Sequence, residues 1–358
     1  MAPHTRCPAD ALIHVPRHLF IPAQAWAKPA GTGAGHWIDR EADPATWWRA
    51  VCSDTVVFTQ LDDGRTELTP GNAAKTYTPT CSASSPLLVN AFLRHLAPRS
   101  GDRVLEVGTG TGWTAGLLSY LTGGPEQVVS VDIDAGLSAA AAANLRSAGL
   151  APRLVVGEGE AGVPGLAPFD RTHVTCGVRE IPYAWVEQTR PGGVIVMPYA
   201  PVMRLLRLKV RDDGTAVGRF HEECAFMVLR GQRGRPAGGD VHVDAPPRVR
   251  KLNRDPATLL HPPPGLQVLF DTVVGDTPWG TEDGVITPLG DGLSRATVRG
   301  DQVTQTGPRD LWDTAERIYD AWLGLGRPGL ERMGVTVTPE EQFVWLDDPA
   351  VPLSYTWK

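Results

Sequence analysis

The sequence predicts an α/β fold with a largely parallel sheet at its centre. Helical and buried-strand patterns alternate over residues 84–230, which is typical of a sheet with helices packed on its faces. A glycine-rich turn, Gly108-Thr-Gly-Thr-Gly112, directly follows the expected strand 103–107. The next expected strand, 128–132, ends in the acidic residue Asp132. These observations predict a ligand-binding turn and an acid at one edge of the sheet.

The individual elements follow from hydrophobic periodicity and from turn residues. Leu88, Phe92 and Leu96 share one helical face, and Gly149 ends an alanine-rich helix. We expect helices at 86–96, 113–121, 135–148 and 183–188, and a later amphipathic helix at 308–323 with Pro308 in its first turn. We expect strands at 103–107, 128–132, 153–156, 170–175 and 193–197, and hairpins at 205–210 with 216–220 and at 334–338 with 342–346.

Composition excludes several classes of protein. The charge of −6 argues against sequence-independent binding to nucleic acid, and no apolar run approaches the length of a membrane span. The N-terminus lacks an apolar signal region, so we expect a cytoplasmic protein. The five cysteines form no Cys-x-x-Cys motif, and Pro16 interrupts the helical spacing of His14 and His18. We therefore expect no metal site.

The glycine turn indicates the kind of ligand. Glycines allow positive φ and close backbone approach, and a helix N-terminus favours an anionic group. No Gly-Lys-Ser/Thr follows, and the spacing is Gly-x-Gly-x-Gly rather than the dinucleotide pattern Gly-x-Gly-x-x-Gly. The run from Glu106 to Gly112 resembles motif I of the S-adenosylmethionine (SAM) methyltransferases. Asp132 suits the ribose hydroxyls; the alternatives are a helix N-cap, for which Asp134 is the better candidate, and a metal-binding pair with Asp134.

Further segments extend the resemblance to one family. In order and spacing, residues 10–200 resemble the protein-L-isoaspartate O-methyltransferases. The matching segments are Val15-Pro-Arg-His-Leu-Phe-Ile-Pro22, Ser84-Ser-Pro86, the glycine turn, Asp132, Gly157-Glu-Gly159 and Pro191-Gly-Gly-Val-Ile-Val-Met-Pro198. The resemblance implies a seven-stranded, Rossmann-like SAM-dependent fold with rearranged last strands, and methylation of a peptide side-chain carboxylate with S-adenosylhomocysteine as product.

The resemblance also assigns residues to the site. Around the cofactor it implies Glu106, Gly108, Thr109, Gly110 and Thr111 for SAM, Asp132 and Ile133 for the ribose, and Gly157 and Glu158 near the adenine. Ser84 matches the family's active-site serine, and we include the neighbouring hydroxyls of Thr80, Ser82 and Ser85 as catalytic candidates. A helix N-cap remains the alternative role for Ser84 or Ser85, because they precede Pro86.

The chemistry explains why no acid–base pair is evident. A carboxylate is already ionised at neutral pH, so methyl transfer to it needs no general base. Catalysis would come mainly from positioning. Hydroxyl groups at 80–85 suit this task, because they donate a hydrogen bond to a carboxylate without neutralising it.

The chain also departs from the repair enzymes. Leu87 stands where they usually have histidine, the segment between Pro22 and Ser84 is enlarged, and a long tail follows the core. This layout resembles homologues that modify ribosomally made peptides (graspetides, lanthipeptides and lasso peptides), in which the methyl ester of one Asp cyclises to an aspartimide. The implied partners are a modified, macrocyclic graspetide-type precursor peptide and an ATP-grasp ligase of the same pathway. The alternatives are isoaspartate repair and a SAM-binding pseudoenzyme that scaffolds a peptide-modifying complex.

We expect four segments along the chain. Residues 1–83 form an N-terminal segment with an enlarged substrate-side insertion, which is loop-rich with short extended runs such as 55–61, and 84–230 form the SAM-binding core. Residues 231–268 form a Pro/Gly-rich linker, and 269–358 form an α+β substrate-recognition unit. Tail aromatics either line a peptide pocket or form the unit's own core; they are Trp279, Trp312, Trp322, Trp345 and Trp357. Basic residues either meet an acidic peptide or lie in solvent; they are Arg248, Arg250, Lys251 and Arg254.

Overall fold

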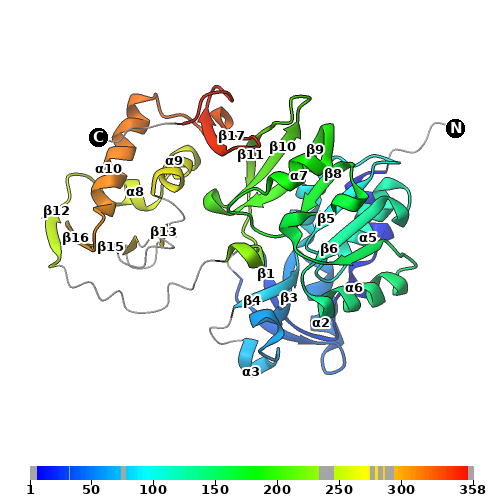
Figure 1. Ribbon diagram of the computed structural model, residues 1–358. Coiled ribbons are helices and arrows are strands. Elements are labelled where there is room, and N and C mark those ends of the chain that lie inside the picture. The colour runs from blue at the N-terminus through cyan, green and yellow to red at the C-terminus, as the bar shows by residue number, and fades with distance from the viewer. Residues whose placement is uncertain are drawn as a thin grey trace.

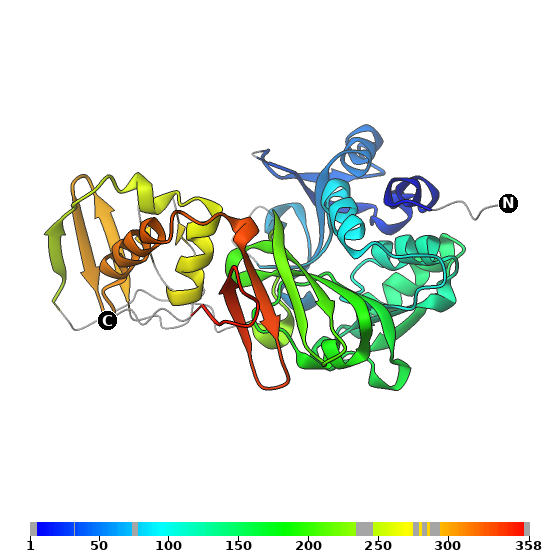
Figure 2. The ribbon, with the colours of Figure 1, turned by 90° about the horizontal axis from the view of Figure 1, so that it is seen from above.

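The described residues of the computed structural model form three β-sheets (Figures 1 and 2). The structure describes residues 6–31, 33–73, 78–233, 246–274, 279–280, 285–286 and 294–353. A nine-stranded sheet lies in the middle, a four-stranded sheet precedes it along the chain, and a five-stranded sheet lies in the C-terminal part. Within the described ranges, no helix is long and apolar enough to cross a membrane.

The central sheet is the α/β fold that the sequence predicts. Its order is β18-β17-β11-β10-β9-β8-β5-β6-β7, parallel from β7 to β9 and antiparallel from β9 to β18. The strands are β5 Val104–Val107, β6 Val128–Asp132, β7 Arg153–Val156, β8 Phe169–Val174, β9 Thr189–Tyr199, β10 Arg204–Val210, β11 Ala216–Glu223, β17 Met333–Val337 and β18 Gln342–Leu346. The expected seven strands become nine because the C-terminal hairpin β17–β18 joins the antiparallel edge through β11.

Helices cover both faces of this sheet. One face carries α1 Pro8–His14, α4 Pro86–Leu96, α5 Trp113–Thr122 and α6 Ala135–Ser147, whose buried residues form one apolar cluster with the sheet. The opposite face carries α7 Tyr183–Gln188, which buries Trp185 in a second cluster. The helices expected in the core are therefore confirmed within one or two residues.

The N-terminal segment is more regular than we expected. It forms the antiparallel sheet β2-β1-β3-β4, with β1 Gln24–Pro29, β2 His36–Asp39, β3 Thr55–Leu61 and β4 Pro79–Ala83. The helices α2 Pro44–Cys52 and α3 Pro70–Ala73 belong to the same segment. Trp47 of α2 is fully buried against this sheet together with Ala25 and Ala27. The expected extended run 55–61 is β3, whereas the other three strands were not predicted, because short strands separated by glycine and proline show little periodicity in the sequence.

The C-terminal part is an α+β extension that appears as a separate lobe in Figures 1 and 2. Its sheet has the order β12-β16-β15-β14-β13, with β12 Arg248–Lys251, β13 Trp279–Gly280, β14 Val285–Ile286, β15 Arg295–Arg299 and β16 Gln302–Thr306. Its helices are α8 Ala257–Leu260, α9 Pro264–Val274 and α10 Leu311–Gly324. The boundaries differ from the expected ones, because the segment expected as a linker contributes β12 and α8, while β17–β18 belongs to the central sheet.

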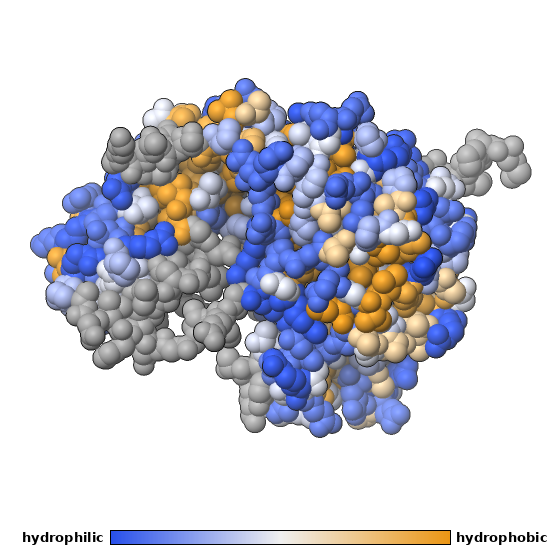
Figure 3. All heavy atoms as spheres, in the orientation of Figure 1, coloured by the Kyte–Doolittle hydropathy of each residue, from blue (hydrophilic) through white to orange (hydrophobic). Residues whose placement is uncertain are grey.

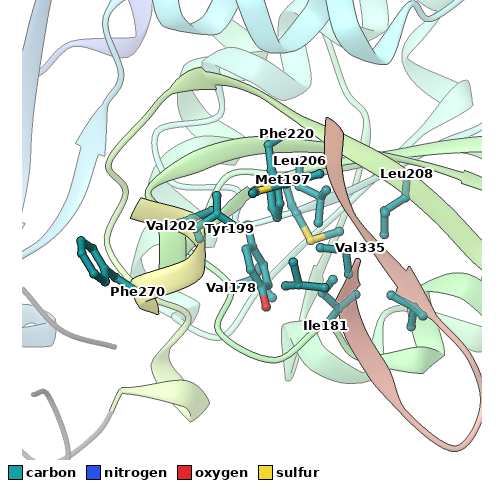
Figure 4. Close-up of a cluster of buried hydrophobic side chains, with 14 of the residues drawn as sticks. Val178, Ile181, Met197, Tyr199, Val202, Leu206, Leu208, Phe220, Phe270 and Val335 are labelled. Atoms are coloured by element: carbon teal, nitrogen blue, oxygen red, sulfur yellow. The ribbon is translucent and has the colours of Figure 1, made fainter. Parts of the chain in front are cut away.

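One apolar cluster connects this lobe to the central sheet (Figure 4). Phe270 of α9 and Val335 of β17 belong to the same buried cluster as Met197, Leu206 and Phe220 of the sheet. The extension is therefore packed onto the core rather than tethered to it.

Two expectations about the tail change in the structure. Helix α10 begins at Leu311 with Asp310 as N-cap, so Pro308 lies outside it. Arg248 and Arg250 pair with Asp310 and Asp313, and the other basic residues of the expected linker also have acidic partners in the lobe. These basic residues are paired within the lobe and therefore do not form a free basic surface.

The described tryptophans of the tail are mostly buried and do not line a separate peptide pocket. Trp312 and Trp345 are fully buried, and Trp322 donates a hydrogen bond to the carbonyl oxygen of Pro328. Trp312 and Trp322 thus belong to the packing of the extension, and Trp345 of β18 belongs to the central sheet, while the Trp279 side chain and Trp357 lie outside the described residues.

Candidate active site

The glycine turn joins β5 to α5 and needs glycine for steric reasons. Gly108, Gly110 and Gly112 have φ of 95°, 52° and 87°, in the left-handed region that disfavours other residues. A Cβ on Gly108 would also collide with the Thr175 hydroxyl and approach Cys176 Sγ to 2.8 Å. The turn therefore brings bare backbone close to the end of β8.

Asp132 ends β6 beside this turn. One carboxylate oxygen accepts a hydrogen bond from the amide of Gly110 (2.9 Å), and the other accepts one from the amide of Asp134 (2.9 Å). The N-cap of α6 is Asp134, whose carboxylate accepts from Gly136 and Leu137. Asp132 is therefore held against the glycine turn and is not the helix cap.

A single pocket brings most of the predicted site residues together. Its lining includes Thr80, Ser82, Ser84, Gly108, Thr109, Gly110, Thr111, Asp132, Ile133 and Glu158. Three predicted residues do not line it: Ser85, Glu106 and Gly157. Glu106 lies fully buried beneath the turn, and Gly157 donates its amide hydrogen to the carbonyl oxygen of Asp132 (3.0 Å). Ser85 is buried at the N-cap position of α4, so its hydroxyl lies outside the pocket lining.

The hydroxyl groups of the β4–α4 segment differ in their hydrogen-bond partners. Thr80 Oγ1 donates to Gln60 (2.9 Å) and accepts from the amide of Asp63 (2.9 Å), which fixes it structurally. Among the described residues, the hydroxyls of Ser82 and Ser84 have no protein hydrogen-bond partner. The N-cap residue of α4 is Ser85 and not Ser84, and the Ser85 side chain makes no capping hydrogen bond. Ser82 and Ser84 are therefore the hydroxyls open to a ligand.

Arg17 positions this serine segment, a role that the sequence did not reveal. Its buried guanidinium donates to the carbonyl oxygens of Val51, Thr55, Ala83 and Ser84 at 2.7–3.2 Å. Burial lowers the pKa of Arg17 to about 10, which still leaves it charged at neutral pH. The N-terminal motif 15–22 thus has a structural role, because its arginine, Arg17, binds the backbone carbonyl group of Ser84.

A buried polar row crosses the sheet beneath the turn. Ser130 Oγ donates to Glu106 (2.6 Å) and lies 2.6 Å from Thr109 Oγ1 in the glycine turn. On the other side, His173 Nδ1 lies 3.9 Å from Glu106 Oε1. His173 lines the pocket, and neither of its ring nitrogens has a hydrogen-bond partner among the described residues.

Burial sets the charge of this row. Desolvation raises the pKa of Glu106 to about 8 and lowers the pKa of His173 to about 4. Both side chains are therefore mainly neutral at pH 7, so their contact is not an ion pair. A single histidine within a strand pattern offers no sequence signal, which is why His173 was missed.

Charged residues close one side of the pocket mouth. Asp63, which has a positive φ of 56°, pairs with Arg230 (3.1 Å) and Arg233 (2.6 Å). Arg230 also lies 3.4 Å from Asp134, to which Gln60 donates a hydrogen bond (3.1 Å). This network links the N-terminal sheet to the segment after β11, and both arginines line the pocket.

The pocket fits a SAM molecule by its own chemistry. The backbone of Gly108 and Gly110 has no side chain and leaves room for a ligand. The carboxylates of Asp132, Glu158 and Glu160 line the pocket, and their negative charge suits a ligand that carries a positive charge. The unpartnered nitrogens of His173 add a polar group inside it. Glu106 and Ser130 support the turn from below.

Fold and pocket together define a SAM-dependent methyltransferase. A family model described as protein-L-isoaspartate(D-aspartate) O-methyltransferase (PCMT) matches residues 72–234. The chain is 35% identical over 155 residues to the protein-L-isoaspartate O-methyltransferase of Methanopyrus kandleri, which covers 42% of this chain and 69% of the relative. The corresponding enzyme of Pyrococcus horikoshii is 36% identical over 155 residues, covering 42% of this chain and 70% of the relative.

The chain belongs to the protein-L-isoaspartate O-methyltransferase family and is an O-methyltransferase with SAM as its cofactor. A solved structure titled protein-L-isoaspartate O-methyltransferase matches the fold with a TM-score of 0.53 and 22% identity, covering 95% of each chain. The architecture that includes the C-terminal part thus has a counterpart of similar extent.

Proposed function

We propose that this protein transfers the methyl group of SAM to a side-chain carboxylate of a peptide. The observation that carries the proposal is the position of Ser82 and Ser84, whose unpartnered hydroxyls line the same pocket as the glycine turn. SAM supplies a methyl group that its sulfonium has already activated. The two serine hydroxyls orient the acceptor carboxylate by donating hydrogen bonds, and Arg17 holds their backbone in place.

Apolar and neutral residues of the pocket lining keep water away from the reacting groups and add no charge next to the acceptor carboxylate. Trp113 and Phe226 supply apolar walls, and the neutral His173 adds no charge that would compete for the carboxylate. No base is needed, because the acceptor is ionised at neutral pH.

Two kinds of peptide are candidates. The first is an isoaspartyl site in a damaged protein, and the relatives named above favour it because they carry that name. The counterpart of the tail in a protein with the same title also favours it.

The second candidate is one Asp of a ribosomally made, graspetide-type peptide, whose methyl ester then closes to an aspartimide. Two features of this chain support it. Leu87, next to the serine segment, is an exposed apolar residue in place of the usual histidine. The pocket lining also includes Arg230 and Arg233, which would suit an acidic peptide that displaces their ion pairs with Asp63. Figure 3 shows the core surface beside the C-terminal lobe as largely hydrophilic.

Intact mass measured after incubation with SAM tests the proposal. An isoaspartyl peptide is compared with a cyclised acidic ribosomal peptide, and one added methyl group is expected on one of them. Loss of methanol from the cyclised peptide alone would favour maturation, and methylation of the isoaspartyl peptide alone would favour repair. Ser84→Ala should lower the rate strongly, whereas Ser85→Ala, at the neighbouring position outside the pocket, is the matched control. Equal rates for the two variants would contradict the role of Ser84.

A further inference from the structure

A histidine–histidine–glutamate cluster lies outside the pocket, where α4 ends against β11. Its members are His95, in the last turn of α4, and the consecutive residues His221 and Glu222 of β11. Their side-chain nitrogen and oxygen atoms all lie within 4.8 Å of one another. None of the three residues lines the SAM pocket.

A β-bulge creates this arrangement. In a regular strand, His221 and Glu222 would point to opposite faces. Here Arg204 pairs with Glu223 and Leu206 pairs with Phe220, so the single residue Leu205 lies opposite both His221 and Glu222. A bulge of this kind redirects side chains. It allows both residues to approach His95.

The distances describe a compact set of metal-ligand atoms. His95 Nε2 lies 2.7 Å from Glu222 Oε2, and the imidazole rings of His95 and His221 are 4.1 Å apart at 36°. The His95 side chain is 18% exposed and that of Glu222 is 45% exposed, so solvent reaches the cluster from one side. The C-terminal end of α4, with its partial negative charge, lies beside it and favours a cation.

The neighbouring arginines are engaged elsewhere. Arg207 donates its Nε hydrogen to the carbonyl oxygen of His95 (2.9 Å), and Arg204 pairs with Glu223 (3.6 Å). These contacts fix the backbone on both sides of the cluster and leave the His95 ring directed at Glu222.

We propose that His95, His221 and Glu222 bind a divalent transition-metal ion of the zinc type. Two imidazoles and one carboxylate are a donor set that zinc accepts, with a water molecule in the fourth position of the tetrahedron. The ion takes the place of the hydrogen shared by His95 Nε2 and Glu222, which requires the His95 tautomer that carries its hydrogen on Nδ1. The ion would fasten the end of α4 to β11. The serine segment directly precedes α4, so the metal would add rigidity to the helix that follows Ser84.

Titration of the tag-free, chelator-treated full chain with zinc chloride tests the proposal. We expect one equivalent to bind, a rise in the melting temperature, and a tetrahedral absorption spectrum with Co²⁺. His95→Asn and His221→Asn should each weaken zinc binding at least roughly tenfold, as expected when a zinc ligand is lost. Both variants should keep wild-type affinity for S-adenosylhomocysteine, which shows that they are folded.

His261→Asn, at an exposed position in the C-terminal lobe, is the matched control and should bind zinc like the wild type. The proposal is overturned if the wild-type chain binds no zinc, or if both cluster variants bind it as tightly as the control does.

Discussion

The buried pair Glu106–His173 predicts an unusual dependence of stability on pH. The pKa of Glu106 rises from 4.5 to about 8, and the pKa of His173 falls from 6.5 to about 4, in both cases through burial. Between pH 4.5 and 8 the unfolded chain ionises Glu106 while the folded chain keeps it protonated, so this residue lowers stability as pH rises. Between pH 4 and 6.5 the unfolded chain protonates His173 while the folded chain does not, so this residue raises stability with pH.

The pKa shifts of Glu106 and His173 can be converted into changes in the free energy of unfolding. Each contributes about 1.4 kcal/mol per pH unit inside its window. They cancel between pH 4.5 and 6.5, and above 6.5 only Glu106 acts, which removes about 2 kcal/mol by pH 8. Across its whole window Glu106 accounts for about 5 kcal/mol, and His173 for about 3 kcal/mol.

Single variants should separate these opposing effects. Urea unfolding without SAM, at several values between pH 4 and 8, measures the free energy of unfolding of each variant relative to the wild type. Glu106→Gln should gain stability relative to the wild type as the pH rises from 4.5 to 8. His173→Leu should lose relative stability from pH 4 to 6.5 and then run parallel to the wild type. If the Glu106→Gln profile runs parallel to the wild type from pH 5 to 8, the buried neutral carboxyl is refuted.

Three further predictions concern the pocket. Gly108→Ala, at φ 95°, should lower the free energy of unfolding by about 1–2 kcal/mol in chemical unfolding, because that is the cost of the left-handed conformation for a residue with a Cβ; unchanged stability would contradict the tight turn. Arg17→Met leaves buried carbonyl groups without donors and should cost about 2–4 kcal/mol in chemical unfolding while lowering kcat, whereas a stable, fully active variant would remove its positioning role. Asp63→Ala releases Arg230 and Arg233, so KM for an acidic peptide should fall about two- to fivefold at low salt and converge with the wild type at high salt. A KM that does not respond to salt would argue against arginine recognition.

The sequence predicted the core well because its signals are local. The glycine turn, the acid ending the next strand and the amphipathic helix Pro86–Leu96 each depend on a few consecutive residues, and the structure contains all three. The same local signals predicted the hairpin β17–β18, although not that it would extend the central sheet.

What escaped prediction depends on long-range contacts. Arg17 meets the Ser84 backbone across 67 residues, and Arg233 meets Asp63 across 170. Ser85 differs from Ser84 only by the direction in which the chain presents it at the start of α4, and no spacing rule distinguishes them. The burial that makes His173 neutral is likewise a property of the assembled layers.

The most direct test of the central claim is the chemical nature of the product on a methylated peptide. Incubation with SAM should add one methyl group as a carboxyl ester, which mild base removes, and Ser84→Ala should reduce its formation. A methyl group that survives base treatment, or SAM binding without transfer to either the isoaspartyl or the cyclised acidic peptide, would contradict a carboxyl methyltransferase acting on these peptides.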